Sequence, residues 1–245
     1  MINQATKDKI EALRKQYESL IKGNERLLKE IALAEIPELV YNSNAIENST
    51  LSLEDTEIIL SGGILGRNVQ VREVYEAKNL AILTETVVEK SKAALSLKLI
   101  LSWHKILLSH IDDKIAGRFR IGKEWVRVGN HLGANPAFVA TLMQELVDRY
   151  KKDKTSYFID AIADFHAEFE TIHPYLDGNG RIGRLLIAAL LEYWQLLPEP
   201  LMYLSGYLKQ HQSEYYRRLS AIRTDGDWEG WVQFFLEAVQ KAAAH

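Results

Sequence analysis

The stretch IHPYLDGNGRIGRLLIAALL, residues 172–191, decides the fold because it joins two apolar helices through a short turn. Apolar residues at 159, 162, 165, 169 and 172 have helical spacing, and Pro174 ends that helix since it lacks a backbone N–H. Apolar residues resume at Ile182 as a second helix. Gly178 and Gly180 allow the turn to take positive φ and to approach a ligand closely. The stretch therefore predicts two buried helices around a ligand-binding turn.

The turn also carries groups that bind phosphates. Backbone N–H groups around Gly178, Asn179 and Gly180 can converge on an anion, and the positive end of the following helix dipole adds to this attraction. Arg181 and Arg184 lie three residues apart on the first turn of that helix. Both supply planar, bidentate donors for phosphate oxygens. The pattern indicates a cradle for more than one phosphate.

Asp177 and His173 add a metal ligand and a base to this cradle. A carboxylate beside phosphates repels them unless a divalent cation lies between, and Mg²⁺ typically binds one or two carboxylates together with phosphate oxygens. We therefore interpret Asp177 as the protein ligand of Mg²⁺. His173 is the group that can accept a proton near neutral pH. Each residue alone has a structural explanation, but their conjunction favours a catalytic site.

A metallohydrolase is the alternative from another chemistry. His166, Glu170 and His173 fall on one helical face, but the zinc-protease spacing H-E-x-x-H is absent. Because His166 also lies on an apolar stripe, we expect it to be a hydrogen-bonded histidine of the core.

Most of the remaining sequence has helical periodicity. Residues 1–34 predict a long amphipathic N-terminal helix, weakened at Gly23-Asn24, which either packs on its own domain or forms a dimeric coiled coil. A helix over 32–48 tolerates Pro37 only near its start. Ser52 and Asp55 have the spacing of a capping box at the start of the next helix. We expect further helices at 74–89, 95–109, 138–150, 159–172, 182–194, 210–222 and 228–242.

One segment has strand character. Residues 117–133, GRFRIGKEWVRVGNHLG, partly alternate apolar side chains with Arg and Lys and are punctuated by glycines. This pattern favours a hairpin over a sheet. We therefore predict an all-α fold with one short β-hairpin, in a single domain over residues 1–245.

Composition limits the possible classes of function. The net charge of −3 gives no global attraction to nucleic acid, and the absence of Cys excludes disulfides and thiolate metal sites. No signal peptide or membrane-spanning segment is visible. We expect a cytoplasmic protein with no membrane or nucleic-acid partner. A homodimer is compatible with this sequence, but no interface can be identified.

Residues 173–184, HPYLDGNGRIGR, resemble the signature H-P-F-x-(D/E)-G-N-G-R-x-x-R of the Fic (filamentation induced by cAMP) domain family. The lead-in helix AIADFHAEFETIHPY, the hairpin and the segment SEYYRRLSAIRTDGDWEGWVQFFL are also similar to the family, so that the likeness covers about 35–239. Tyr175 stands where the family has Phe, and a buried hydroxyl there needs a partner. The resemblance implies a Fic core over 74–240, with a flap at 117–131.

The activity that the resemblance implies is transfer of AMP from ATP to a Tyr, Thr or Ser hydroxyl of a target protein, or of the protein itself. His173 would be the general base and Asp177 would hold Mg²⁺. The phosphates would be held by Gly178, Asn179, Gly180, Arg181 and Arg184. Gly180 is a lysine in the kinase-like branch of the family, so its presence favours AMP transfer. Another nucleotide moiety remains an alternative, as does a non-catalytic nucleotide-binding module.

A second motif lies upstream, in the region 35–60. Ser43 and Glu47 fall on or beside the buried stripe of the predicted helix, and a buried carboxylate needs a partner unless it turns to water. SNAIEN, residues 43–48, resembles the family's inhibitory pattern (S/T)-x-x-x-E-(G/N) in its N-terminal, intramolecular class. The resemblance implies that Glu47 pairs with Arg184 and keeps the enzyme off. Some relatives use the same glutamate to remove AMP, so de-AMPylation is a further alternative.

The hairpin is the expected docking site for the target. An exposed strand edge near Ile121, Val126 and Val128 can pair with an extended segment through backbone hydrogen bonds. A hairpin that merely covers the core is the other interpretation.

Overall fold

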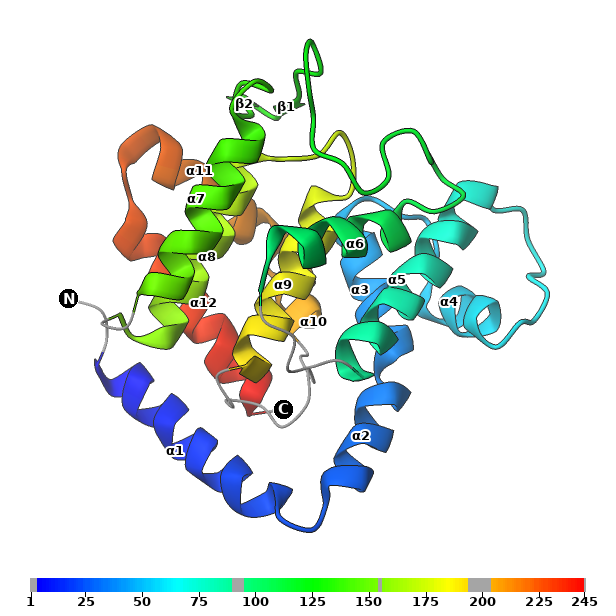
Figure 1. The fold of residues 1–245 in the computed structure, drawn as a ribbon. Coiled ribbons are helices and arrows are strands. Elements are labelled where there is room, and N and C mark those ends of the chain that lie inside the picture. Colours follow the sequence, from blue (N-terminus) through cyan, green and yellow to red (C-terminus); the bar gives the residue numbers. More distant parts are fainter. Residues whose placement is uncertain (1–3, 90–94, 154–155, 194–203, 245) are drawn as a thin grey trace.

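The computed structural model describes residues 4–89, 95–153, 156–193 and 204–244. These residues form twelve α-helices and one two-stranded hairpin, which confirms the predicted fold class (Figure 1). The helices are α1 Gln4–Ile21, α2 Glu25–Ala34, α3 Ile36–Ile46, α4 Leu53–Leu60, α5 Val71–Glu89, α6 Leu97–Leu107, α7 Val139–Lys152, α8 Phe158–Ile172, α9 Asn179–Tyr193, α10 Leu204–Gln210, α11 Gln212–Asp225 and α12 Trp228–Ala243. The strands are β1 Arg127–Val128 and β2 His131–Leu132.

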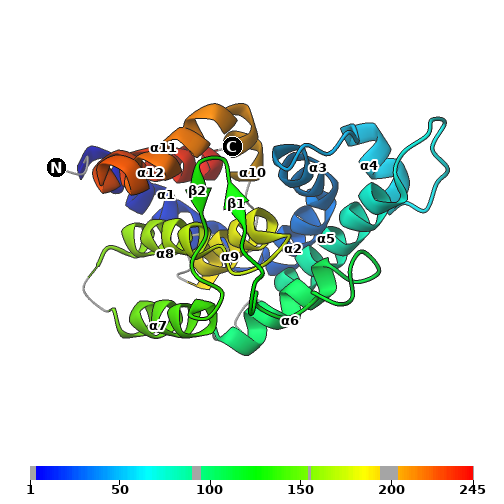
Figure 2. The same cartoon turned by 90° about the horizontal axis from the view of Figure 1, so that it is seen from above.

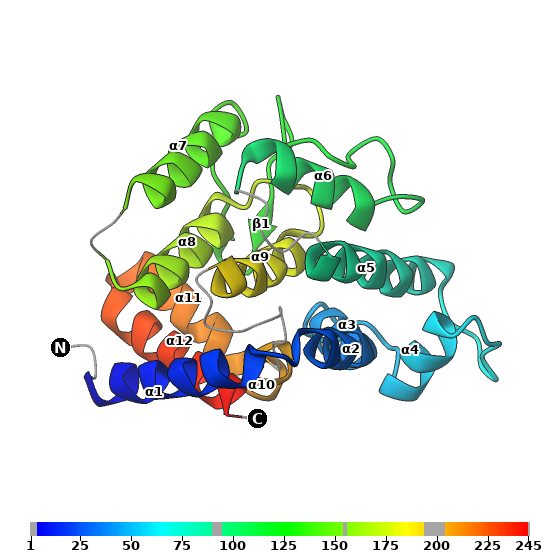
Figure 3. The same cartoon turned by 60° about the horizontal axis from the view of Figure 1, so that its bottom comes forward.

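Helices α8 and α9 form the centre of the molecule. They pack on each other, α5 and α6 contact α9 on one side, and α7, α11 and α12 contact α8 on the other (Figure 3). Nearly every described position of α9 from Ile182 to Leu191 is buried, as expected for a helix that is apolar all round. The turn between α8 and α9 is thereby held at the edge of the core.

The N-terminal segment differs from the single helix predicted over 1–34. Gly23 takes a φ of +86°, a conformation that ends α1, and α2 starts only after Asn24. Helix α1 packs on α12, with Ile10 fully buried and the hydroxyl of Tyr17 donating to the carbonyl of Ala243 at 2.6 Å. Packing on its own domain is therefore the correct interpretation for α1.

Two further boundaries differ from the predictions. The helix expected over 32–48 is divided at Glu35, and α3 carries Pro37 in its first turn, where its missing N–H has no cost. Helix α9 begins at Asn179, inside the turn, and the last residue predicted for it, Trp194, lies outside the described residues. The capping box of Ser52 and Asp55 is confirmed.

The hairpin is shorter than its sequence pattern suggests. Its ladder pairs Arg127 with Leu132 and Val128 with His131. Ile121 and Val126, expected at the strand edge, lie in the preceding loop, where the Glu124 carboxylate accepts from the backbone N–H of Ile121 at 2.8 Å. A side chain that satisfies the backbone in this way replaces strand pairing.

The hairpin lies over the ends of α8 and α9 (Figure 2). The backbone N–H of Ala134 donates to the carbonyl of Ile172 at 3.1 Å, and the ring of His131 is 2.9 Å from the carbonyl of Thr171. None of the described helices combines the length and the apolar content needed to cross a membrane.

Candidate active site

His173 is the C-cap of α8 and takes a left-handed conformation, with φ 51° and ψ 65°. This conformation is uncommon outside glycine and persists only where the surroundings fix it. Arg120, which is 1% exposed, fixes it by donating to the carbonyls of His173 at 2.8 Å, Ile172 at 3.2 Å and Ala134 at 2.9 Å. One buried guanidinium thus ties the flap to the end of α8. The direction of the His173 side chain depends on this clamp.

The floor of the turn is an aromatic pair. Tyr175 is fully buried and stacks on His104 of α6, with ring centroids 3.7 Å apart. His104 bridges two loops, because Nε2 is 3.0 Å from the carbonyl of Asp177 and Nδ1 accepts from the backbone N–H of Gly117 at 3.0 Å. Burial lowers the pKa of His104 to about 4, so the ring is neutral at pH 7. The partner expected for the Tyr175 hydroxyl is not found among the described residues.

Asn179 has a different part from the one expected for its side chain. Its amide oxygen accepts from the backbone N–H of Tyr175 and its amide nitrogen donates to the carbonyl of Tyr175, both at 2.9 Å. The Asn179 side chain therefore closes the turn, with both ends of its amide bonded to the backbone of Tyr175. Gly178 is required next to it, with a φ of +82° and with Leu107 only 2.9 Å from where a Cβ would lie.

Asp177 lies in a network with α5. It accepts from Arg181 at 3.0 Å and from Arg72, and Arg181 also lies 3.2 Å from Glu76. Burial raises the pKa of the Asp177 carboxyl, but Arg181 and Arg72 outweigh burial and hold this pKa below its usual range. The carboxylate is therefore ionised at neutral pH. The Arg72 side chain is 51% exposed, so one of the two cations beside Asp177 is free to move away.

Arg184 is bound by Ser43 and Glu47 at the C-terminal end of α3. Its Nε donates to the Ser43 hydroxyl at 3.0 Å and its Nη2 donates to the Ser43 carbonyl at 2.8 Å, while Nη2 also lies 2.9 Å from Glu47 Oε1. The ion pair implied by the family resemblance is therefore present. The arginine is 4% exposed, whereas 38% of the Glu47 side chain is exposed. A Cβ on Gly180 would lie 2.2 Å from Glu47 Oε1, so the Glu47 carboxylate rests directly against this glycine.

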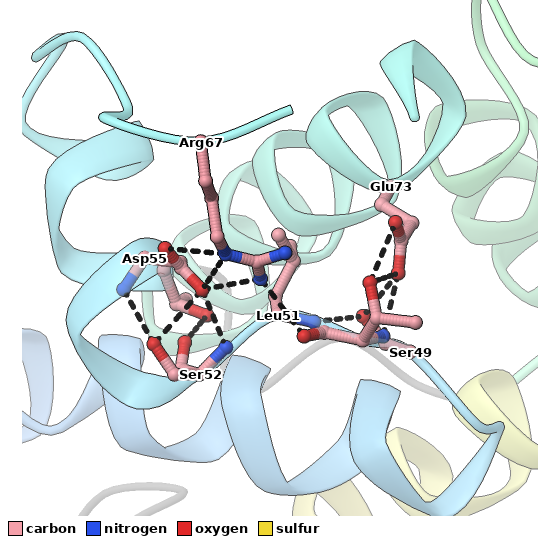
Figure 4. A network of polar contacts seen from close by, with 8 residues as sticks. Ser49, Leu51, Ser52, Asp55, Arg67 and Glu73 are labelled. Carbon is pink, nitrogen blue, oxygen red and sulfur yellow. Dashed lines mark hydrogen bonds and ion pairs between the residues drawn. The ribbon is translucent and has the colours of Figure 1, made fainter. Parts of the chain in front are cut away.

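The end of α3 that presents Glu47 is anchored on two sides. Gln212 and Tyr216 of α11 donate to the carbonyl of Ile46, at 2.9 and 3.2 Å. The chain leaving α3 is held by Glu73 of α5, which is 7% exposed and accepts from Ser49 and from the backbone and hydroxyl of Thr50 (Figure 4). Arg67 donates to the carbonyl of Thr50 at 2.9 Å and also forms an ion pair with Asp55. These contacts fix Glu47 relative to Arg184.

The site is a pocket of about 440 Å³ between α3, the hairpin, α8, α9 and α11. Of the residues expected from sequence, Glu47, Val128, His173, Gly180 and Arg184 line this pocket. Asp177 and Arg181 do not line it and lie toward α5, and Ile121 and Val126 are also outside it. The rest of the wall comes from residues to which the sequence assigned no role in this site: Gly129, Asn130, His131, Glu170, Tyr215, Tyr216, Leu219, Ser220 and Arg223.

His166 is the hydrogen-bonded core histidine that its sequence position predicts. It is 1% exposed, and its Nε2 lies 2.8 Å from the hydroxyl of Tyr215. In the described part of the chain, no group of three or more His, Asp or Glu side chains has the arrangement of a metal site. His166, Glu170 and His173 therefore do not form the metal centre of the alternative interpretation.

Sequence reasoning did not identify Arg120, His104 and Arg72. The signal for Arg120 was hidden in the alternating charge pattern of the flap, which is typical of a solvated strand face. His104 lay on an apolar helix, and Arg72 sits 105 residues from its partner Asp177.

Comparison with known proteins identifies the fold and the motif. The Fic/DOC family model matches residues 94–191. The chain is 30% identical over 206 residues to the protein adenylyltransferase Fic of Drosophila willistoni, covering 82% of this chain and 40% of that protein. The protein of the same name from Drosophila grimshawi is 29% identical, with 82% and 41% covered. The chain thus spans about two fifths of the length of these relatives.

Two solved structures have the same fold. A Fic family protein from Desulfovibrio desulfuricans superposes with a TM-score of 0.83 and 28% identity, covering 100% of this chain and 74% of that one. Fic-1 from C. elegans, residues 134–508, has a TM-score of 0.78 and 24% identity, covering 99% and 71%. This fold, together with the family match that spans the turn between His173 and Arg184, identifies a Fic/DOC domain in this chain.

Proposed function

We propose that this protein is an adenylyltransferase, a nucleotidyltransferase that moves AMP from ATP to a Tyr, Thr or Ser hydroxyl of a target protein. One observation carries the proposal: His173, Gly180 and Arg184 line a single pocket, so that a base, a phosphate cradle and a guanidinium face the same space. The names of the Drosophila relatives support the same activity.

The first turn of α9 is the proposed phosphate site. Its backbone N–H groups, at Asn179, Gly180 and Arg181, belong to the first turn of α9 and have no intrahelical partner, so they would donate to the phosphate oxygens. Arg184 would bind the γ-phosphate once it is free of Glu47. Arg181, with 4% of its side chain exposed, would neutralise charge from behind the turn.

Asp177 is the proposed protein ligand of Mg²⁺. It is one ionised carboxylate beside the phosphate turn, and magnesium bound together with phosphates needs only one or two carboxylates. When bound, Mg²⁺ would offset the charge that develops on the leaving pyrophosphate. Arg72 would have to leave Asp177 for the cation to bind, and Glu76, one turn further along α5, already accepts from Arg72 at 3.0 Å.

The proposed reaction needs one proton acceptor. The target hydroxyl attacks the α-phosphorus, an oxygen–phosphorus bond forms, and the bond to the β-phosphate oxygen breaks to release pyrophosphate. The hydroxyl proton moves to His173, whose left-handed backbone directs the ring into the pocket. The N–H groups of the turn and the two arginines of α9 stabilise the charge on the phosphates.

Glu47 is the proposed inhibitor of this reaction. Its carboxylate pairs with Arg184 at 2.9 Å and rests against Gly180, so it takes both the arginine and the space that a γ-phosphate would need. Ser43 would hold Arg184 in this inactive pairing. ATP that enters beside Glu47 would then bind without its α-phosphate in line for attack.

Target docking is proposed for the flap. Val128 is 39% exposed and lines the pocket, and the outer edge of β1 has no strand partner among the described residues. An extended target segment paired with β1 would bring its hydroxyl over His173. Ile121, which is 61% exposed, and Val126 would contact the flanks of that segment.

The test is intact-mass analysis of the purified protein after incubation with ATP and Mg²⁺. Glu47→Gly and Glu47→Gln should gain the mass of AMP by self-modification, well above wild type. Glu38→Gln, on the same helix but without a contact to Arg184, is the matched control and should behave as wild type. Saturable ATP binding without any mass gain would instead indicate a non-catalytic module. The cytoplasmic location and a homodimer stay predictions.

A further inference from the structure

Glu170 is a carboxylate in the active-site wall to which the proposed reaction gives no part. It lies on α8 three residues before His173, and 11% of its side chain is exposed. Its Oε2 is 3.7 Å from His173 Nδ1, while its Oε1 is buried without a partner among the described residues. Burying an ionised carboxylate is costly, so its retention in this position calls for a reason.

The Nδ1 nitrogen of His173 also lacks a hydrogen-bond partner. This nitrogen is buried and has no hydrogen-bond partner among the described residues, and Glu170 is the carboxylate next to it. The 3.7 Å separation exceeds a hydrogen bond, but catalytic hydrogen bonds are often long without substrate and tighten in the reacting complex. A small side-chain rotation would close the contact.

The surroundings keep Glu170 ionised. Burial raises the pKa of its carboxyl, but the contact with His173 and the charges of the neighbouring groups outweigh burial and lower that pKa. The titratable and charged groups around the Glu170–His173 pair come from α8, α9, α11 and β2: His166, Arg184, Tyr215, Tyr216, Arg223 and His131. His166 is neutral at pH 7, since burial lowers its pKa to about 4.

Gly183 supplies independent support from the neighbouring helix. A Cβ at this position of α9 would lie 2.5 Å from Glu170 Oε1 and 3.0 Å from His166 Cε1. Glycine inside a helix is unfavourable relative to alanine, so a reason for it is expected. The absence of a side chain at Gly183 leaves the space into which the Glu170 carboxylate extends.

We propose that Glu170 is a positioning residue for His173. Its carboxylate accepts from Nδ1–H, which leaves Nε2 unprotonated and facing the pocket. As the target hydroxyl gives its proton to Nε2, the imidazolium that forms is stabilised by Glu170, which itself stays unprotonated. The catalytic consequence rests on the proposed AMP transfer, whereas the tautomer of His173 does not.

The direct test is nitrogen-15 NMR of the imidazoles in the wild-type chain, with His173 assigned by loss of its signals in His173→Ala. We expect His173 to carry its proton on Nδ1. Glu170→Gln should increase the share of His173 that carries its proton on Nε2, because a neutral amide accepts from Nδ1–H more weakly than a carboxylate does. Glu168→Gln, two residues away on the same helix, is the matched control and should leave His173 unchanged. An unchanged tautomer of His173 in Glu170→Gln would overturn the proposal.

Kinetics provide a second readout in the Glu47→Gly background. Glu170→Gln should lower kcat on the order of 10²-fold with the KM for ATP unchanged. Glu170→Asp should recover part of the rate. Gly183→Ala should reproduce the change in the His173 tautomer, because the added Cβ would lie 2.5 Å from Glu170 Oε1 and displace this carboxylate. A changed His173 tautomer without AMP transfer in any variant would count against AMP transfer and leave the Glu170–His173 pairing intact. AMP transfer with an unchanged tautomer would count against the pairing.

Discussion

The buried hydroxyl of Tyr175 leads us to predict that its removal increases the stability of the protein. Tyr175 is 0% exposed, and its hydroxyl has no hydrogen-bond partner in the described part of the chain. The family signature has Phe here. Tyr175→Phe removes the polar atom and keeps the ring that stacks on His104. The substitution should therefore stabilise the protein, although most core substitutions destabilise.

The size of the gain follows from the cost of an unpaired polar group. A buried hydroxyl without a partner costs about 1–3 kcal/mol. In a chain of this length each kcal/mol shifts Tm by about 2–4 °C, so Tyr175→Phe should raise Tm by roughly 2–12 °C. Tyr215→Phe is the matched control, since the same atom is removed from a fully buried tyrosine whose hydroxyl bonds His166 at 2.8 Å. That variant should lose about 1–3 kcal/mol instead.

Urea unfolding followed by circular dichroism measures both variants under the same conditions. The expected result is a higher midpoint for Tyr175→Phe and a lower midpoint for Tyr215→Phe, with unchanged m values. If Tyr175→Phe were destabilised as much as Tyr215→Phe, the Tyr175 hydroxyl would have a stabilising partner such as a buried water, and the reasoning would be refuted.

Three further predictions follow. The pKa of His104 is about 4 in the folded protein, against an ordinary value of 6.5. The stability that comes from burying the neutral ring is therefore complete above pH 6.5 and is lost toward pH 4, by about 3 kcal/mol in total. Urea midpoints should fall from pH 7 to pH 5, and they should fall less in His104→Gln. Arg72→Ala should strengthen divalent-cation binding, seen as a larger Mn²⁺-dependent gain in ATP affinity, because Asp177 loses a competing cation; a smaller gain would mean that Arg72 binds the phosphates itself. His173→Ala should abolish transfer with ATP affinity by calorimetry unchanged, and a large loss of affinity would argue against its role as the base.

The sequence was most informative where local chemistry alone determines structure. Helical spacing located α8 and α9, Pro174 marked the end of α8, and the Ser52 capping box was found where predicted. The ion pair of Glu47 and Arg184 spans far-apart segments, and only the family resemblance indicated it. The break at Gly23 is the intermediate case, because a glycine weakens a helix without requiring that it end.

Other parts of the site depend on contacts that no local pattern contains. Arg120 looks like a solvent-facing residue of a strand, yet it is buried because the carbonyls of the flap and α8 meet around it. Asn179 has a residue type suited to phosphate binding, but the turn uses its amide for its own closure. The hairpin is short because Glu124 satisfies the backbone of the preceding loop. In each case tertiary hydrogen bonds override local propensity.

The most direct measurement of AMP transfer compares ATP labelled at the α-phosphate with ATP labelled at the γ-phosphate, using Glu47→Gly with and without His173→Ala. The account predicts that α-label becomes covalently attached to protein, above the wild-type level, and that the attachment disappears when His173 is replaced. Covalent γ-label, or α-label that persists without His173, would contradict it.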